Sequence, residues 1–190
     1  FQKLAQEYTK KEISSKILEV EAKGECLREI MEKGWKSGLM NLCIPEEYDG
    51  LGADPTSIAA IVEEIAYGCS GIATSMMTND LANAVIALHG SPEQKEKYLK
   101  PFTQKPLFSS FCLTEAEAGS DNLSMSTYLK KRNDGKYVLN GSKQFITNAT
   151  YADQFTVFCK LNSPKAQFLA CVVTPRNPAE GKIETGKLEV

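Results

Sequence analysis

The spacing of apolar residues changes once along this chain, and that change restricts the fold more than any other feature. Up to about residue 103, apolar residues recur every three to four positions among lysines and glutamates, as in amphipathic helices. Beyond Pro101 and Pro106 the apolar runs are short, β-rich and separated by turn residues. The sequence therefore predicts an α+β protein, with an all-α helical bundle over residues 1–103 and a β domain over residues 104–190.

Five helices are expected in the first part. An amphipathic helix should include Leu4 to Leu18, and a second should stop near Gly38. Asp54 as N-cap and Pro55 as first helical residue should open a third helix, which ends around Gly68. A fourth helix over residues 72–88 is mostly apolar and should lie at the centre of the bundle.

The junction after the fourth helix carries clear signals. His89, the only histidine, should lie at the helix C-terminus, where the helix dipole favours it, and alone it cannot build a multi-histidine metal site. Gly90 can take the C′ position. The residues Ser91-Pro92-Glu93-Gln94 then predict a fifth helix with a capping box.

Six short strands are expected in the second part, enough for a small barrel or sandwich that is left incomplete. Asn133-Asp134-Gly135 should turn a hairpin between the second and third of them. Because the sheet looks unfinished at the end of the sequence, we expect the chain to be truncated. The expected strands are residues 107–113, 126–131, 137–139, 144–147, 154–160 and 167–174.

Composition excludes several classes of function. A net charge of −2 without a basic stripe argues against nucleic-acid binding. No apolar run is long enough to span a bilayer. Six cysteines without a C-x-x-C pair are typical of reduced core thiols, and a reducing compartment follows. We find no nucleophile elbow, P-loop or H-E-x-x-H motif, and no metal site is expected.

Two polar segments, residues 111–121 and 140–149, flank the predicted hairpin, which should bring them together. Hydroxyl and backbone donors next to aromatic rings suit the polar edge and the flat face of a planar heterocycle. The alternative is two ordinary turn-rich loops whose polar side chains bond to the local backbone. The candidate donors are Thr114, Gly119, Ser120 and Thr147, with aromatic flanks at Phe111 and Phe145.

These segments resemble the signature of the acyl-CoA dehydrogenases. Residues 38–52 and 63–68 also resemble that family, and in detail its medium-chain branch. The likeness covers nearly the whole chain and has the family's order of a helical domain before a β domain. The signature is Cys112-Leu113-Thr114-Glu115-x-x-Ala118-Gly119-Ser120-Asp121, followed by Tyr137-x-Leu139-Asn140-Gly141-x-Lys143-x-Phe145-Ile146-Thr147-Asn148.

The resemblance implies FAD-dependent α,β-dehydrogenation of a fatty acyl-CoA thioester to the trans-2-enoyl-CoA, as in β-oxidation. It implies electron-transferring flavoprotein as the acceptor and a homotetramer when the chain is complete. It also implies the mitochondrial matrix in a eukaryote, or the cytoplasm in a bacterium. Two alternatives stay open: an acyl-CoA oxidase whose flavin reacts with oxygen, and a non-catalytic binding or assembly module with this fold.

The resemblance also assigns residues. Thr114 would donate to the flavin pyrimidine edge, Thr147 would reach flavin N5, and Phe145 would wall the ring system. Ser120 would also border the acyl-CoA. Ala73 and Met77 would line the end of the acyl pocket, with plain core packing as an equal alternative. The full implied cofactor-binding set is Phe111, Cys112, Leu113, Thr114, Gly119, Ser120, Phe145, Ile146 and Thr147.

The chain departs from the family pattern in places. Ala116-Glu117 stands where the family often has Pro-Gly, and Phe111 and Phe145 replace Tyr and Trp. The family's catalytic glutamate lies in a C-terminal helical domain with no counterpart here, so this fragment alone should be inactive. Neither Glu115 nor Asp121 is expected to replace that base, because charged residues beside such a loop are usually solvated or capping. The isolated fragment should be poorly soluble or bind FAD weakly.

Overall fold

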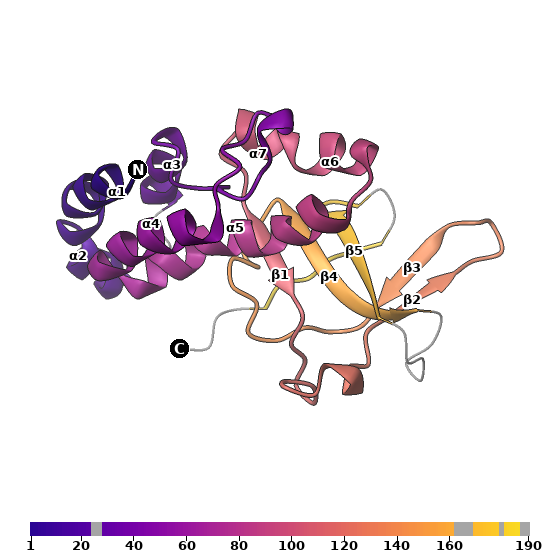
Figure 1. Ribbon diagram of the computed structural model, residues 1–190. Helices are drawn as coiled ribbons and strands as arrows, with labels where there is room; N and C mark the ends of the chain where they lie inside the picture. Colours follow the sequence, from indigo (N-terminus) through magenta and orange to yellow (C-terminus); the bar gives the residue numbers. More distant parts are fainter. Residues whose placement is uncertain (24–27, 162–168, 179–180, 187–190) are drawn as a thin grey trace. The chain divides into compact units, whose positions relative to one another are not determined.

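The computed structural model describes residues 1–23, 28–161, 169–178 and 181–186. Contacts divide it into two compact units, Phe1–Leu107 and Phe108–Val190, which we describe separately. The first unit is helical, and the second contains a single five-stranded sheet (Figure 1). The predicted α+β class, with helices before strands, is confirmed.

The helical unit contains seven α-helices among its described residues. A π-helix and a 3-10 helix lie between some of them. In chain order the elements are α1 (Gln2–Tyr8), the π-helix Thr9–Ser14, α2 (Ile17–Lys23), α3 (Arg28–Lys36), the 3-10 helix Glu46–Tyr48, α4 (Pro55–Gly68), α5 (Ser70–His89), α6 (Pro92–Tyr98) and α7 (Lys100–Gln104).

The first predicted helix is interrupted rather than continuous. Tyr8 and Ile13 are buried as expected, but Leu4 is 39% exposed and Leu18 is 80% exposed. The π-helix Thr9–Ser14 explains the exposure of Leu18, because a wider turn shifts the phase of every residue that follows it. A uniform helical period therefore fails beyond Tyr8.

The predicted start of α4 is confirmed. The Asp54 side chain accepts hydrogen bonds from the backbone N–H groups of Thr56 (2.9 Å) and Ser57 (3.2 Å), and Pro55 is the first helical residue. Two otherwise unpaired N–H groups of the first turn are thereby satisfied.

The predicted capping box of α6 is also confirmed. Ser91 Oγ accepts from the Gln94 N–H at 3.3 Å, and Gln94 Oε1 accepts from the Ser91 N–H at 2.8 Å. Gly90 differs from a left-handed C′ glycine because its φ is −70°. It is required by space instead, since a Cβ there would lie 2.6 Å from the carbonyl oxygen of Ile86.

The central helix α5 is less apolar inside than its sequence predicts. Leu81 is 54% exposed and Leu88 is 74% exposed, whereas several polar side chains are buried. Asn79 can be buried because its amide donates to Asn41 Oδ1 (3.0 Å) and to the Leu107 carbonyl (2.8 Å). The buried residues of α5 are Ala73, Met76, Thr78, Asn79, Asp80, Ala82, Asn83 and Ile86.

The sheet unit is organised around its longest strand, β4. This strand pairs in parallel with β1 and β2 and antiparallel with β5, while β2 and β3 form the predicted hairpin (Figure 1). Gly135 turns that hairpin with a φ of 83°. The strands are β1 (Ser109–Cys112), β2 (Tyr128–Lys131), β3 (Tyr137–Asn140), β4 (Gln154–Leu161) and β5 (Leu169–Pro175), with a 3-10 helix at Asn122–Ser124 before β2.

The prediction of a strand at residues 144–147 is wrong, because these residues do not form one. Phe145 has a φ of 57° and Asn148 a φ of 66°, and this left-handed backbone cannot continue an extended strand. The segment is a loop instead. The described residues therefore form one five-stranded sheet rather than the predicted six-stranded sandwich or barrel.

Candidate functional site

The two polar segments meet, as the predicted hairpin requires. We call residues 113–121 the first loop, residues 141–148 the second loop, and both together the paired loops. The Gln144 N–H donates to the Thr114 carbonyl at 2.9 Å. Lys143 Nζ donates to the Leu113 carbonyl at 2.8 Å. Main-chain atoms of the first loop are thus held directly by the second.

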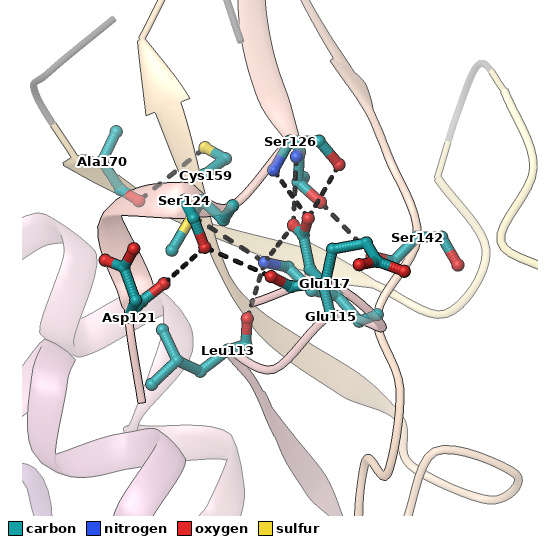
Figure 2. Close-up of polar contacts among 12 residues, drawn as sticks. Leu113, Glu115, Glu117, Asp121, Ser124, Ser126, Ser142, Cys159 and Ala170 are labelled. Carbon is teal, nitrogen blue, oxygen red and sulfur yellow. Dashed lines mark hydrogen bonds and ion pairs between the residues drawn. The ribbon is translucent and has the colours of Figure 1, made fainter. Parts of the chain in front are cut away.

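A buried ion pair joins the paired loops. Lys143 Nζ lies 2.8 Å from Glu115 Oε1, and the two side chains are only 9% and 5% exposed. The Glu115 carboxylate also accepts from Ser126 N (2.6 Å), Ser126 Oγ (2.8 Å) and Thr127 N (3.0 Å). Figure 2 shows the hydrogen bonds between Glu115 and Ser126. It also shows the hydrogen bond that the Leu113 carbonyl accepts.

Glu115 is therefore buried and caps backbone N–H groups, which is the second of the two arrangements expected for it, rather than solvated. Burial alone would raise the pKa of its carboxyl, but hydrogen bonds from Lys143, Thr127 and Ser126 outweigh that effect and lower the pKa to about 2. An ionised carboxylate whose oxygens are occupied is a poor general base. The expectation that Glu115 does not serve as the base agrees with this geometry.

The second loop exposes an aromatic ring on a strained backbone. Phe145 is 85% exposed and has positive φ, which is unusual for a bulky residue. The next residue, Ile146, packs against the core cluster that includes Cys112 and Phe155. Phe145 therefore faces solvent while the next residue, Ile146, faces the core, and the ring of Phe145 is left open to a ligand or a partner.

The turn that carries Thr147 is fixed from several sides. Ser110 Oγ donates to the Thr147 carbonyl at 2.8 Å. Buried Asn148 donates to the Ser109 carbonyl at 3.4 Å and accepts from the Tyr151 hydroxyl. Its carbonyl also accepts from the N–H groups of Tyr151 and Ala152. Thr147 is thus held by strand β1 and by the turn that follows it.

Three predicted donors keep free hydroxyls. In the part of the chain that the structure describes, the side chains of Thr114, Ser120 and Thr147 make no hydrogen bond. Thr114 and Thr147 are half-buried, and Ser120 is exposed. At exposed Gly119 a Cβ would meet nothing within 4 Å. The paired loops therefore carry unpaired donors as well as an exposed aromatic ring.

The remaining predicted residues are already engaged in the fold. Cys112 is 4% exposed, and burial raises the pKa of its thiol to about 12. The Phe111 ring packs against Phe158, with ring centroids 4.9 Å apart. The Leu113 carbonyl already accepts from Lys143. These three residues shape the site rather than offer free side-chain donors.

Ala73 and Met77 lie on α5, in the helical unit. Ala73 is buried, at 3% exposure, and Met77 is half-buried. The burial of Ala73 is what the core-packing alternative predicts, while Met77 keeps part of its surface open. Their role at an acyl pocket stays a prediction.

Sequence reasoning missed the residues that assemble the site. Lys143 and Asn148 lie within the quoted signature, but the resemblance assigns neither of them a role, and Ser110 lies outside it. The available signal was one lysine in the second of two segments predicted to meet and three acidic residues in the first, Glu115, Glu117 and Asp121. Local sequence does not show whether two such charges are solvated or buried against each other.

Several other features bear on the predicted classes. Among the described residues, no cluster of three or more metal-ligating side chains occurs. No helix in those same segments is long and apolar enough to cross a membrane. The cysteines at 43, 69, 112, 159 and 171 are free thiols, and Cys26 lies outside the described residues.

Family comparisons agree with this fold and with the order of its parts. Residues 1–105 match the N-terminal domain of acyl-CoA dehydrogenase, and residues 110–189 match its middle domain. Together the two matches cover the helical unit and the sheet unit that carries the paired loops. The chain belongs to the acyl-CoA dehydrogenase family.

Two relatives show the range within the family. The chain is 35% identical to the probable medium-chain specific acyl-CoA dehydrogenase 2, mitochondrial, of Caenorhabditis briggsae, over 84% of this chain and 39% of that protein. It is 40% identical to the caffeyl-CoA reductase-Etf complex subunit CarC of Acetobacterium woodii, over 86% of this chain and 43% of that protein. The chain thus spans less than half the length of either relative.

Solved structures give the same picture. Butyryl-CoA dehydrogenase from Megasphaera elsdenii superposes with a TM-score of 0.84 at 32% identity, covering 92% of this chain and 47% of that one. An acyl-CoA dehydrogenase from Bacillus anthracis, solved in complex with FAD, superposes with a TM-score of 0.82 at 29% identity, covering 94% of this chain and 30% of that one.

Proposed function

We propose that the protein containing this chain is an FAD-dependent acyl-CoA dehydrogenase and that the paired loops bind the flavin. The observation that carries the proposal is that the paired loops hold both the unpaired hydroxyls of Thr114, Ser120 and Thr147 and the exposed ring of Phe145. The expected reaction is α,β-dehydrogenation of a fatty acyl-CoA thioester to the trans-2-enoyl-CoA.

The chemistry of the donor set fits this cofactor. Flavin ring carbonyls and nitrogens accept hydrogen bonds, which the free hydroxyls of Thr114 and Thr147 are able to donate. Phe145 supplies an apolar wall, and its exposure is explained if a planar ring covers it. Bound FAD would supply the hydride acceptor and pass electrons to electron-transferring flavoprotein.

The role of this chain is to bind and to orient. Thr114 and Thr147 hold the flavin edge, and the fixed turn around Asn148 keeps Thr147 in place without reorganisation. Glu115 is occupied by its partners, and by the family resemblance the proton-abstracting glutamate would lie in the family's C-terminal helical domain. Ser120 would border the acyl-CoA, and Ala73 and Met77 would line the end of its pocket.

The assembly and location are proposals of the same kind. By the family resemblance the complete protein would be a homotetramer. It would act in the mitochondrial matrix of a eukaryote or in the cytoplasm of a bacterium.

A second candidate is the reverse reaction, reduction of an α,β-unsaturated acyl-CoA. It is supported by the 40% identity to the caffeyl-CoA reductase-Etf complex subunit, which exceeds the 35% identity to the medium-chain relative. Both reactions use the same flavin site. They differ in the direction in which hydride would pass between the acyl-CoA and the flavin.

The test is a visible absorbance spectrum of the complete purified protein, followed by anaerobic additions. Saturated acyl-CoAs of graded chain length should bleach the flavin if dehydrogenation is the reaction. Reoxidation of the reduced protein by unsaturated acyl-CoAs, without bleaching by saturated ones, would favour the reductase. Rapid oxygen consumption with substrate would identify an oxidase, and a protein without flavin would contradict the proposal.

A further inference from the structure

We propose that Glu115 and Lys143 are positioning residues of the flavin site, whose buried ion pair sets the spacing of the paired loops and thereby the places of Thr114 and Phe145. The inference rests on the proposed function, because it assumes that the paired loops hold FAD. Neither residue is assigned a contact with cofactor or substrate.

Lys143 reaches three points of the neighbouring segments with one ammonium group. Its Nζ is 2.8 Å from the Leu113 carbonyl, 2.8 Å from Glu115 Oε1 and 3.9 Å from Met125 Sδ. An ammonium has three N–H donors, so this arrangement uses all of its capacity. A side chain in the second loop thus fixes the first loop on both sides of Thr114.

Glu115 extends this connection to the hairpin. Its carboxylate accepts from the N–H groups of Ser126 and Thr127, the two residues before β2. Its own backbone forms a two-way bridge with Ala118, at 3.0 and 3.2 Å. That bridge closes the turn Glu115–Ala118, which Gly119 and Ser120 follow directly in the sequence. Glu115 therefore joins the first loop, the second loop and the start of the hairpin.

The groups held in this way are neighbours of the free donors. Thr114 lies between Leu113 and Glu115, and its carbonyl accepts from the Gln144 N–H beside Lys143. Phe145 follows Gln144 directly. A buried ion pair adds little net stability compared with apolar residues of similar size. Its hydrogen bonds do fix a distance that flexible apolar side chains would leave undefined.

The test compares Lys143→Met, Glu115→Gln and the double variant in the complete protein. FAD dissociation constants and thermal midpoints are measured for each, with the exposed β2 residue Lys130→Met as control. Each single variant should lower the midpoint, because it removes one partner of a buried pair. The double variant should recover most of that loss but still bind FAD about ten-fold more weakly than the wild type.

Recovery of FAD affinity together with the midpoint in the double variant would overturn the inference, since the pair would then be merely structural. If the double variant does not fold, Lys143→Arg decides. Arginine keeps the charge but changes the reach, so the midpoint should hold while FAD affinity falls; unchanged affinity would contradict the inference. A wild-type protein that binds no FAD would instead contradict the proposed function itself.

Discussion

Each unit contains a buried carboxylate, and the pKa values of the two are shifted in opposite directions. Asp80 in the helical unit is 4% exposed, and burial raises the pKa of its carboxyl to about 6. Glu115 in the sheet unit is 6% exposed, yet its pKa falls to about 2 because four hydrogen bonds, one of them from the Lys143 ammonium, outweigh the same burial effect. Burial therefore does not determine the charge of a carboxyl; its partners do.

The two pKa shifts differ because the two carboxylates have different numbers of hydrogen-bond partners. Asp80 Oδ1 accepts from the Cys43 N–H at 2.7 Å, but Asp80 Oδ2 has no partner among the described residues. Nearby on α5, both amide atoms of buried Asn83 are likewise unpaired within the described structure. In the sheet unit the network is complete at the place where two loops must be held. A satisfied polar network specifies geometry, whereas an unsatisfied one mainly costs stability.

The largest effect should come from breaking the complete network. Lys143→Met leaves the Glu115 carboxylate buried without its cation, so the free energy of unfolding should fall by about 3–5 kcal/mol. Urea denaturation of the complete protein at pH 7 measures it. Lys130→Met, at an exposed position, should change the free energy by less than about 0.5 kcal/mol. A loss below about 1 kcal/mol for Lys143→Met would mean that the pair is solvated.

Acid should weaken the sheet unit through Glu115. Its pKa is below its ordinary value of 4.5, so its contribution is present above pH 4.5 and is lost as the pH falls towards 2. The contribution amounts to about 3.5 kcal/mol. Denaturation midpoints of wild type and Glu115→Gln should therefore converge between pH 4.5 and 2. A constant difference across that range would contradict the lowered pKa.

Asp80 should show the opposite dependence. Its pKa of about 6 lies above its ordinary value of 3.8, so the folded state binds the extra proton, and stability falls as the pH rises from about 4 to 6. Asp80→Asn removes that dependence and keeps an acceptor for the Cys43 N–H. The free energy of unfolding of the variant minus that of the wild type should be about 3 kcal/mol larger at pH 7 than at pH 4. A pH-independent difference between the two proteins would show that Asp80 does not titrate in this range.

The smallest effect separates two asparagines on the same helix. Asn83→Leu removes an amide without partners in the described structure, so stability should be unchanged or rise by about 1 kcal/mol. Asn79→Leu should instead lower the free energy of unfolding by about 2 kcal/mol, because Asn41 and Leu107 lose a donor. Thermal denaturation of both variants measures the contrast. An equal loss in both would indicate that a bound water satisfies Asn83.

Local signals in the sequence were enough for much of the fold. The caps at Asp54 and Ser91 are confirmed because side-chain and backbone atoms within three residues make them. The turn at Gly135 is confirmed for the same reason. Element type was equally predictable where periodicity was uninterrupted, as in α4 and β4.

The failures required tertiary information. The π-helix after Tyr8 exposed Leu18, and no local residue announced it. Phe145 was assigned to a strand because its neighbours are β-prone, whereas contacts with the first loop hold it in a left-handed backbone. At the site, hydroxyl and aromatic positions were predictable from the signature. The burial of Glu115 against Lys143 was not, since it depends on two segments 28 residues apart.

The most direct test of the account is FAD titration of the complete apoprotein carrying Phe145→Ala. The ring is 85% exposed, so its removal should leave the thermal midpoint nearly unchanged. If the ring covers a flavin, the FAD dissociation constant should rise about ten-fold, while the exposed hairpin variant Tyr137→Ala should bind as the wild type does. Equal affinity in Phe145→Ala and wild type would contradict the claim that the paired loops form the flavin site.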